Sequence, residues 1–283
     1  MITKWIKRLF VALIIITIIF IIILHIGASS FRFPESSFPD GVEMVKQNYN
    51  NKEVRYAKTE NTASDNLILF VHGAPGSAGD LIKYLQIDTL QKQASLISID
   101  RLGYGYSDYG NVATIKEQVD YLNFIISKEG IGKSIYLVGH SYGGPIIAAY
   151  ANAHKADGIL LLAAVIDPYN EKIFWFSYFS FWKATRWLLP GYIKVAGAEK
   201  ESHASELLKM KDVWSKLDVP VIMIHDSLDY IAPGIENITW ATAQIKDSLF
   251  YFQPSIGDSH FIPFENEELT TSMILRLLNN KKK

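Results

Sequence analysis

Residues 139–144 have the sequence GHSYGG and place Ser141 in the pattern G-x-S-x-G. This segment follows a short apolar run, Ile135–Val138, and precedes a helix-like segment that starts near Pro145. A serine on a tight strand-to-helix turn has a strained backbone and an exposed hydroxyl, and the flanking glycines prevent side chains from colliding there. The N-terminus of the following helix also favours negative charge at this point. We therefore predict that Ser141 is a nucleophile.

A serine hydroxyl is a poor nucleophile at neutral pH, so a base must take its proton and an acid must orient that base. Of the seven histidines, His260 is the one in a loop after a late apolar run, Leu249–Phe252, and before the last helix-like segment. Such a loop lies at the carboxyl edge of a parallel sheet, beside the turn that carries the serine. We predict that His260 is the general base.

Three carboxylates compete for the role of the acid. Asp229 lies just past the apolar run Val219–His225, where a carboxylate can reach the histidine nitrogen that is turned away from the serine. Asp226 is nearer the run and suits a turn, whereas Asp167 follows the adjacent apolar run and can approach the same histidine. We predict Asp229 as the acid and keep the other two as alternatives.

Residues 72–77, HGAPGS, follow the apolar run Leu67–Val71 and form a tight loop with backbone amides at the same edge of the sheet. Because amides suit an oxyanion, we assign the N–H groups of Ala74 and Tyr142 to the hole that stabilises a tetrahedral intermediate. We expect His72 to brace this loop by hydrogen bonding. The G-x-G at residues 103–105 lacks the third glycine and the helix of a dinucleotide-binding turn.

The scaffold for these groups is predicted from the alternation of strand-like and helix-like segments. Apolar runs typical of fully buried strands are separated by stretches long enough for crossover helices, which indicates a parallel sheet after an opening hairpin. A first strand is expected within residues 31–50. The other expected strands are Glu53–Lys58, Leu67–Val71, Leu96–Ile99, Ile135–Val138, Gly158–Val165, Val219–His225 and Leu249–Phe252. The expected helices are Leu81–Gln93, Ile115–Lys128, Pro145–His154 and Glu265–Leu278.

Residues 169–218 interrupt this alternation and are predicted to form a lid. They hold eleven aromatic residues, eight of them between Phe174 and Trp187, so this is the most aromatic part of the chain. A helix over Phe174–Trp182 would be apolar nearly all round and would have to be buried or lie in an apolar interface. Its surface is expected either to pack on the domain beneath or to line an acyl pocket or touch a bilayer.

The first thirty residues are predicted to be a membrane anchor. From Leu9 to Leu24 every residue except Thr17 is apolar, which is enough for a helix to cross a hydrocarbon core. Lys4, Lys7 and Arg8 precede this run, so the N-terminus is expected in the cytoplasm and residues 31–283 outside it. The alternative is a signal peptide cleaved at the small residues 28–30, which would release a secreted enzyme.

Composition narrows the classes of function. The 28 basic and 29 acidic residues nearly cancel, so no overall field favours nucleic acid. The absence of cysteine excludes disulfides, thiolate metal sites and a cysteine nucleophile. We expect one catalytic domain that acts on a small molecule, with no metal and no cofactor.

With HGAPGS, residues 100–108 (DRLGYGYSD), the GHSYGG turn, Asp229 and His260 in this order, the chain resembles the α/β-hydrolase fold superfamily. The resemblance extends from about Leu67 to Leu278. It implies a mostly parallel eight-stranded sheet whose second strand is antiparallel, helices on both faces, a helical lid after strand six, and the triad roles given above. The chain departs from its relatives at residues 226–227, Asp-Ser, where Gly-Asp is common.

Members of this superfamily with a serine nucleophile include esterases, lipases, thioesterases, amidases, peptidases and carbon–carbon bond hydrolases, so the fold does not select a substrate. The aromatic lid and the apolar N-terminus favour hydrolysis of a carboxylic ester with a lipophilic acyl or aryl group. An acyltransferase, an amidase or peptidase, or a carbon–carbon bond hydrolase would use the same residues. A ligand-binding receptor without turnover is the alternative outside enzymology.

Overall fold

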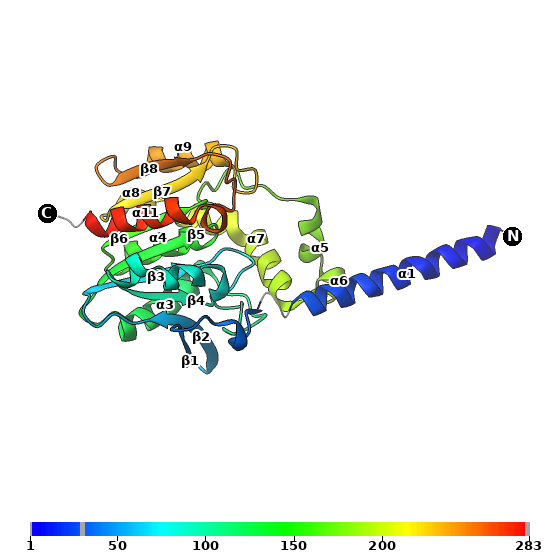
Figure 1. Ribbon diagram of the computed structural model, residues 1–283. Coiled ribbons are helices and arrows are strands. Elements are labelled where there is room, and N and C mark those ends of the chain that lie inside the picture. Colours follow the sequence, from blue (N-terminus) through cyan, green and yellow to red (C-terminus); the bar gives the residue numbers. More distant parts are fainter. Residues whose placement is uncertain (1, 29–31, 281–283) are drawn as a thin grey trace.

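The computed structural model describes residues 2–28 and 32–280 of the chain. An apolar helix, α1 (Ile2–Gly27), stands away from a rounded α/β domain (Figure 1). Residues Lys4–Gly27 of this helix are long and apolar enough to cross a membrane. Of the small residues at which cleavage was considered, Ala28 is buried, and residues 29 and 30 lie outside the described part of the chain.

The domain is built on one sheet of eight strands in the order β1-β2-β4-β3-β5-β6-β7-β8. Strand β2 is antiparallel to both of its neighbours, and the other neighbouring pairs are parallel. This arrangement confirms the predicted mostly parallel sheet. The strands are β1 Glu43–Tyr49, β2 Lys52–Thr59, β3 Asn66–Val71, β4 Ser95–Ile99, β5 Ser134–His140, β6 Gly158–Leu162, β7 Val221–Asp226 and β8 Phe250–Ser255.

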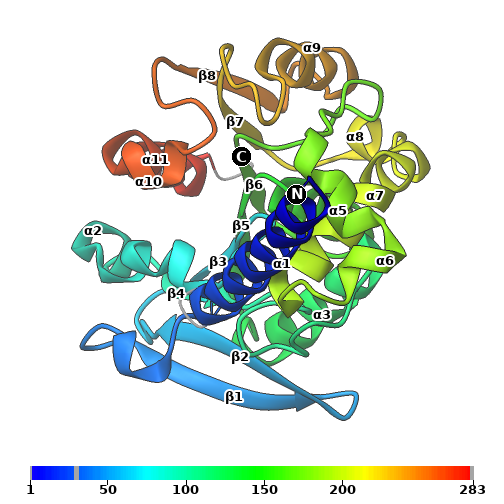
Figure 2. The ribbon, with the colours of Figure 1, turned by 90° about the vertical axis from the view of Figure 1, so that its right-hand side faces the viewer.

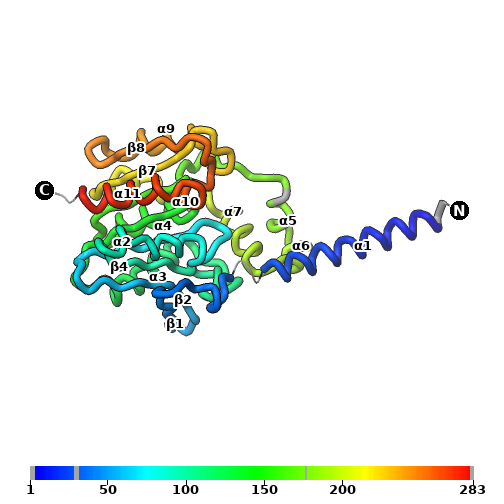
Figure 3. The backbone as a smooth tube through the Cα atoms, in the orientation of Figure 1, coloured from blue at the N-terminus to red at the C-terminus, as the bar shows by residue number. Residues whose placement is uncertain are grey.

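Helices cover both faces of the sheet, as Figure 2 shows in a view along it. The smooth tube in Figure 3 follows the chain through these layers. On one face lie α3 (Ile115–Glu129), α4 (Gly143–Ala153), α8 (Val213–Lys216) and α9 (Gly234–Gln244). On the other lie α2 (Asp88–Gln91), α10 (Ile262–Glu265) and α11 (Glu267–Asn279).

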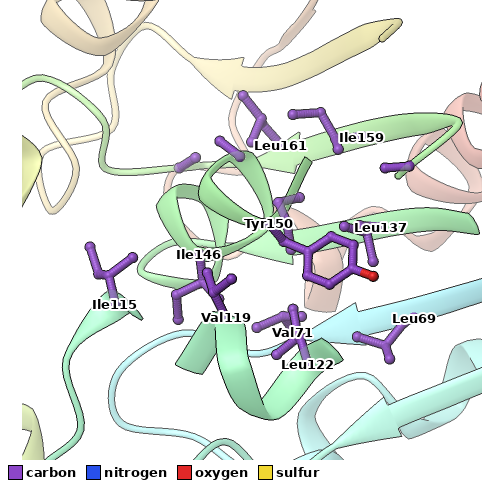
Figure 4. Close-up of a cluster of buried hydrophobic side chains, with 14 of the residues drawn as sticks. Leu69, Val71, Ile115, Val119, Leu122, Leu137, Ile146, Tyr150, Ile159 and Leu161 are labelled. Carbon is purple, nitrogen blue, oxygen red and sulfur yellow. The ribbon is translucent and has the colours of Figure 1, made fainter. Parts of the chain in front are cut away.

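The central strands β3, β5, β6 and β7 contain continuous apolar runs because each face of the sheet has its own core. In β3, Leu69 and Val71 belong to the core under α3 and α4, whereas Ile68 and Phe70 belong to the core under α2 and α11. Figure 4 shows the first core, in which Leu122 of α3 lies among these side chains. Burial on both faces explains why the strands have continuous apolar runs rather than alternating ones.

Two expected elements are shorter than their sequence pattern suggested. The segment expected as a helix over Leu81–Gln93 is divided into 3-10 turns, Ala78–Asp80 and Ile82–Gln86, and the short helix α2. Tertiary contacts explain this, since the Tyr84 ring stacks on Phe70 and its hydroxyl donates to Pro263 O at 2.6 Å. Strand β6 ends at Leu162 rather than at residue 165, because Ala163 has a positive φ of 44°.

Residues 169–218, called the insertion below, connect β6 to β7. They hold the 3-10 turn Trp175–Ser177 and the helices α5 (Tyr178–Phe181), α6 (Lys183–Arg186), α7 (Gly191–Lys209) and α8. In place of one helix over Phe174–Trp182, the segment forms the 3-10 turn Trp175–Ser177 followed directly by α5, and the helical backbone ends at Trp182, which is extended (φ −75°, ψ 119°). Aromatic side chains lose rotamer freedom in a helix, and serine favours helix ends, so this segment has weak helical propensity. A further 3-10 turn, Glu35–Ser37, precedes β1.

Candidate active site

Ser141 lies on the turn between β5 and α4, at the carboxyl end of a central strand. Its φ is +52°, a left-handed conformation that is unusual for a residue with a side chain. A Cβ added to Gly139 would lie 2.6 Å from Gly143 O, and one added to Gly143 would lie 2.3 Å from Val71 O. The two glycines are therefore required by close backbone contacts, which agrees with the reason given from the sequence.

Three of the predicted residues form a continuous chain of hydrogen bonds. His260 Nε2 lies 3.0 Å from Ser141 Oγ, and His260 Nδ1 lies 2.8 Å from Asp229 Oδ2. All three side chains are buried, with exposed fractions of 3% for Asp229, 6% for His260 and 8% for Ser141. A carboxylate accepts at Nδ1, so this ring nitrogen carries the proton and Nε2 is free to accept the serine proton.

Asp229 is held by its own loop and by a second histidine. Its Oδ1 accepts from the backbone N–H groups of Ile231 at 2.8 Å and Ala232 at 3.0 Å, and His225 Nε2 lies 3.3 Å from its Oδ2. Burial acts to raise the pKa of Asp229, but the hydrogen bonds from His225 and His260 outweigh it and lower that pKa. The carboxylate therefore stays ionised beside His260.

The other candidate acids have different partners. Asp167 accepts from Tyr169 N at 2.8 Å and from Asn170 Nδ2 at 2.7 Å, so it closes its own turn. Asp226 Oδ2 accepts from the backbone N–H groups of Gly257 at 2.9 Å and Ser259 at 3.0 Å. Asp226 thereby joins the end of β7 to the loop that carries the catalytic histidine candidate, which gives the Asp-Ser departure at residues 226–227 a structural role.

Two further histidines support the site, and sequence reasoning had not given either this role. His225 Nε2 donates to Ala232 O at 3.0 Å while it faces Asp229. His140 Nε2 donates to the backbone oxygen of His260 at 3.0 Å. Burial, followed by the nearby His260, lowers the pKa of His140 to about 3, so this ring is neutral. The signal for His140 was its place inside the G-x-S-x-G turn, and His225 ends the run that leads to Asp229.

The loop 72–77 lies against the serine turn. A Cβ on Gly73 would be 3.0 Å from Ser141 Cβ, so the backbone of this loop passes directly beside the nucleophile candidate. His72 is buried, its Nδ1 donates to Gly73 O at 2.7 Å, and its Nε2 accepts from Arg101 N at 3.0 Å. His72 thus braces the loop, and its pKa is lowered by burial and by the Arg101 guanidinium.

Helix α7 of the insertion brings charged and aromatic partners to the same place. Glu199 is buried and pairs with Arg101, with Oε1 2.7 Å from Nη1. The His203 ring packs against the ring of Tyr142 at a centroid distance of 4.5 Å and an interplanar angle of 31°, and His203 Nδ1 lies 3.0 Å from Glu171 Oε1. These contacts join residues far apart in sequence, and no local pattern indicated them.

Within the described part of the chain, no group of three or more histidine and carboxylate side chains is arranged to hold a metal ion. The site offers a serine, a histidine and an ionised carboxylate in hydrogen-bonding sequence, and the backbone of the loop 72–77 passes beside the serine. Such an arrangement is suited to nucleophilic attack with proton transfer.

Comparison with known proteins gives the same architecture. The family model described as alpha/beta hydrolase fold matches residues 66–193, a stretch that contains the loop 72–77 and Ser141 but ends before Asp229 and His260. No curated protein matches the sequence.

Solved structures resemble the chain at low sequence identity. A bacterial membrane phospholipase A is 16% identical and has a TM-score of 0.65, with 96% of this chain and 98% of that chain covered. The monoacylglycerol lipase of Paleococcus ferrophilus is 16% identical with a TM-score of 0.62, and the match covers 80% of this chain and 98% of that one. An esterase from a Rhodococcus species is 17% identical with a TM-score of 0.63, and the match covers 86% of this chain and 100% of that one. At these identities the likeness shows the fold.

Proposed function

We propose that this chain, which has the α/β-hydrolase fold, is a serine hydrolase that cleaves a carboxylic ester with a lipophilic acyl or aryl group. The observation that carries this proposal is the hydrogen-bonded series Ser141 Oγ, His260 and Asp229, with distances of 3.0 Å and 2.8 Å. The serine attacks the ester carbonyl while His260 Nε2 takes its proton, and Asp229 stabilises the resulting imidazolium.

The negative charge of the tetrahedral intermediate is stabilised by the backbone N–H groups of Ala74 and Tyr142. His260 then donates its proton to the leaving alcohol, which leaves an acyl group on Ser141. In the second half of the reaction His260 removes a proton from water and the hydroxide attacks the acyl group. His260 then returns this proton to Ser141 Oγ as the acid is released, which restores the free enzyme. No cofactor takes part in this scheme.

A lipophilic substrate is supported by the position of the site. The carboxyl ends of the parallel strands, the insertion and α1 lie on one side of the molecule (Figure 1), so the site faces the apolar part of the chain. A membrane phospholipase A is among the similar structures, and its match covers 96% of this chain. We further propose that α1 is an uncleaved anchor, with the N-terminus in the cytoplasm and the domain outside it.

The enzymatic proposal is tested by labelling the purified full chain with a fluorophosphonate, which reacts covalently with an activated serine. The natural chain is expected to be labelled, and Ser141→Ala is expected to lose the label. Ser107→Ala is a matched control, because Ser107 is also buried and has the same hydroxyl. A folded natural chain that stays unlabelled, or equal labelling of Ser141→Ala, would overturn the mechanism.

A further inference from the structure

The insertion carries an exposed aromatic surface, defined here as Tyr178, Phe179, Trp182 and Trp187. The exposed fractions of these side chains are 60%, 52%, 65% and 70%. Between α5 and Trp182 lies a hollow of about 430 Å³ lined by aromatic side chains alone. Large apolar side chains gathered on a surface mark a place of contact with another apolar body. They do not stabilise the domain by packing, since most of their area faces outward.

This surface lies next to the C-terminal end of α1. Figure 1 shows α1 leaving the domain on the side of α5 and α6, and in Figure 2 these two helices lie beside α1. His25 Nε2 donates to Leu188 O at 3.0 Å, one residue beyond Trp187. Ile21 and Leu24 are half-buried and Ala28 is buried, whereas Lys4–Phe20 are exposed. Within the described residues, the last two turns of α1 and Ala28 therefore contact the domain, mainly at the insertion and also beside Tyr104.

The geometry of α1 sets the depth of this contact in a membrane. A hydrocarbon core of about 30 Å takes about 20 helical residues at 1.5 Å each. A span that begins at Leu9, the first residue of the apolar run, therefore ends close to Ala28. The insertion, which contacts α1 between Ile21 and Ala28, then lies at the outer boundary of the hydrocarbon. Tryptophan and tyrosine are enriched at this depth because their rings are apolar and their N–H and O–H groups are polar.

We propose that the aromatic surface docks on the outer leaflet of the bilayer that holds α1, and that the hollow beside Trp182 receives a lipid acyl chain. This inference rests on the anchored topology of the proposed function and adds the surface through which the catalytic domain meets lipid. The insertion then lies between the active site and the membrane, so a lipophilic ester reaches Ser141 without crossing bulk water. Lys183, which is exposed directly after Trp182, carries a charge suited to phosphate head groups.

The absence of cysteine from the chain allows single labels to test this proposal. Trp182→Cys and Trp187→Cys are labelled with a nitroxide in the full chain and reconstituted into phosphatidylcholine vesicles. Ile131→Cys is the control, because Ile131 is 78% exposed and lies between α3 and β5 at the opposite edge of the sheet. Collision rates with oxygen, which partitions into lipid, and with a water-soluble nickel chelate are measured for each label.

Docking predicts that the labels at 182 and 187 collide several-fold less with the chelate and more with oxygen than the label at 131. The same variants are washed with alkaline carbonate. One contrary outcome is that the labels at 182 and 187 collide with the chelate as often as the control label does, while the protein stays in the pellet. This outcome would overturn docking and leave the anchored topology intact. Protein in the supernatant would overturn the anchored topology as well, while fluorophosphonate labelling still reports on the enzyme. Spin–spin broadening between labels would instead identify a second copy as the occupant and overturn the proposal.

A second inference rests on a separate observation, the hydrogen bonds of the Gly73–Ala74 peptide. Gly73 O accepts from His72 Nδ1 at 2.7 Å and from Arg101 Nη2 at 2.9 Å. In a planar trans peptide the carbonyl and the following N–H point in opposite directions. Two donors that fix the Gly73 carbonyl therefore also fix the direction of the Ala74 N–H, which is one of the two proposed oxyanion donors.

Arg101 is itself held by the insertion. Its Nη1 and Nη2 lie 2.7 and 3.1 Å from the two carboxylate oxygens of Glu199, which also accepts from Tyr104 OH at 2.6 Å. Both charged side chains are buried, so the pair is rigid and removal of one charge leaves the other unpaired. We infer that Glu199 is a positioning residue that couples helix α7 to the oxyanion hole through Arg101. This inference rests on the proposed acyl-enzyme mechanism.

Glu199→Gln tests the coupling, with Tyr104→Phe as a milder variant and Glu201→Gln as the control. Glu201 lies on the same helix and only approaches Arg186 at 4.0 Å, with more than half of its side chain exposed. Glu199→Gln is expected to lower kcat about tenfold or more with little change in KM. The reason is that a misdirected Ala74 N–H forms a weaker hydrogen bond to the oxyanion of the tetrahedral intermediate. Affinity for a trifluoromethyl ketone, which forms a tetrahedral adduct, should fall in parallel, and Tyr104→Phe should show the same trend more weakly.

A structural role alone would lower the unfolding temperature of Glu199→Gln and leave its kcat and ketone affinity equal to those of Glu201→Gln. That result would overturn the coupling. A natural chain that binds neither fluorophosphonate nor ketone would instead overturn the proposed function, so the two failures are distinguishable.

Discussion

The carboxyl edge of the sheet and the insertion above it use their side chains in opposite ways. At the edge, polar groups such as His260, Asp229 and Asp226 are buried and connected by hydrogen bonds between 2.8 and 3.0 Å. In the insertion, Trp182 and Trp187 are large, apolar and exposed. Buried polar groups are costly to leave unpaired, whereas exposed aromatic groups contribute little to folding. Substitutions at the edge should therefore affect chemistry and stability, and those on the insertion should affect contact with lipid.

The largest effect on activity is expected at Asp229, the proposed acid of the triad. Asp229→Asn is expected to lower kcat by a factor on the order of 10⁴, because an amide that donates to His260 favours the wrong tautomer of the ring. The matched control is Asp167→Asn, since Asp167 hydrogen-bonds to Tyr169 and Asn170 rather than to the histidine. Rates of ester hydrolysis by the purified full chain give the comparison. Large loss in Asp167→Asn with activity kept in Asp229→Asn would reverse the assignment.

Acid should destabilise the same edge. The pKa of His140 is lowered by burial, and then by His260, from 6.5 to about 3, so the unfolded chain binds more protons between these two pH values. Stability is therefore complete above pH 6.5 and falls as the pH drops toward about 3, by about 1.4 kcal/mol per pH unit for this group. Urea unfolding at several pH values measures the slope, and His140→Gln should reduce it. An unchanged slope in that variant would show that His140 does not carry the effect.

The edge could be predicted from the sequence because its signals are local. Gly139 and Gly143 lie two residues from Ser141 on either side, and continuous apolar runs mark strands that are buried on both faces. The order of serine, aspartate and histidine along the chain then indicated which side chains the topology would bring together. Contacts such as Arg101 with Glu199, or His203 with Tyr142, depend on how α7 lies over the sheet, so no pattern near either residue could indicate them.

The insertion was predicted less well because its apolar and polar residues do not alternate with a helical or strand period. A segment that is apolar nearly all round does not indicate which face is buried, so both its helical extent and its burial stayed open. The structure divides it at Trp182 and leaves Tyr178 and Phe179 more than half exposed. Of the two interpretations, exposure argues against simple packing on the domain beneath.

The smallest expected effect is on the stability of the domain when an exposed aromatic residue is removed. Trp187→Ser should change the free energy of unfolding by no more than about 0.5 kcal/mol, because the side chain is 70% exposed and its indole donates only to Ala184 O in its own turn. Leu69→Ala is the contrast, since Leu69 is fully buried in the core of the sheet and its truncation should cost about 2–5 kcal/mol. Both values are measured by denaturant unfolding of the full chain in detergent. If Trp187→Ser were as destabilising as Leu69→Ala, the aromatic surface would be part of the folded core, and the distinction between the two regions would fail. A small effect, together with a lipid-facing label at residue 187, would show that this surface is retained for contact with the membrane rather than for folding.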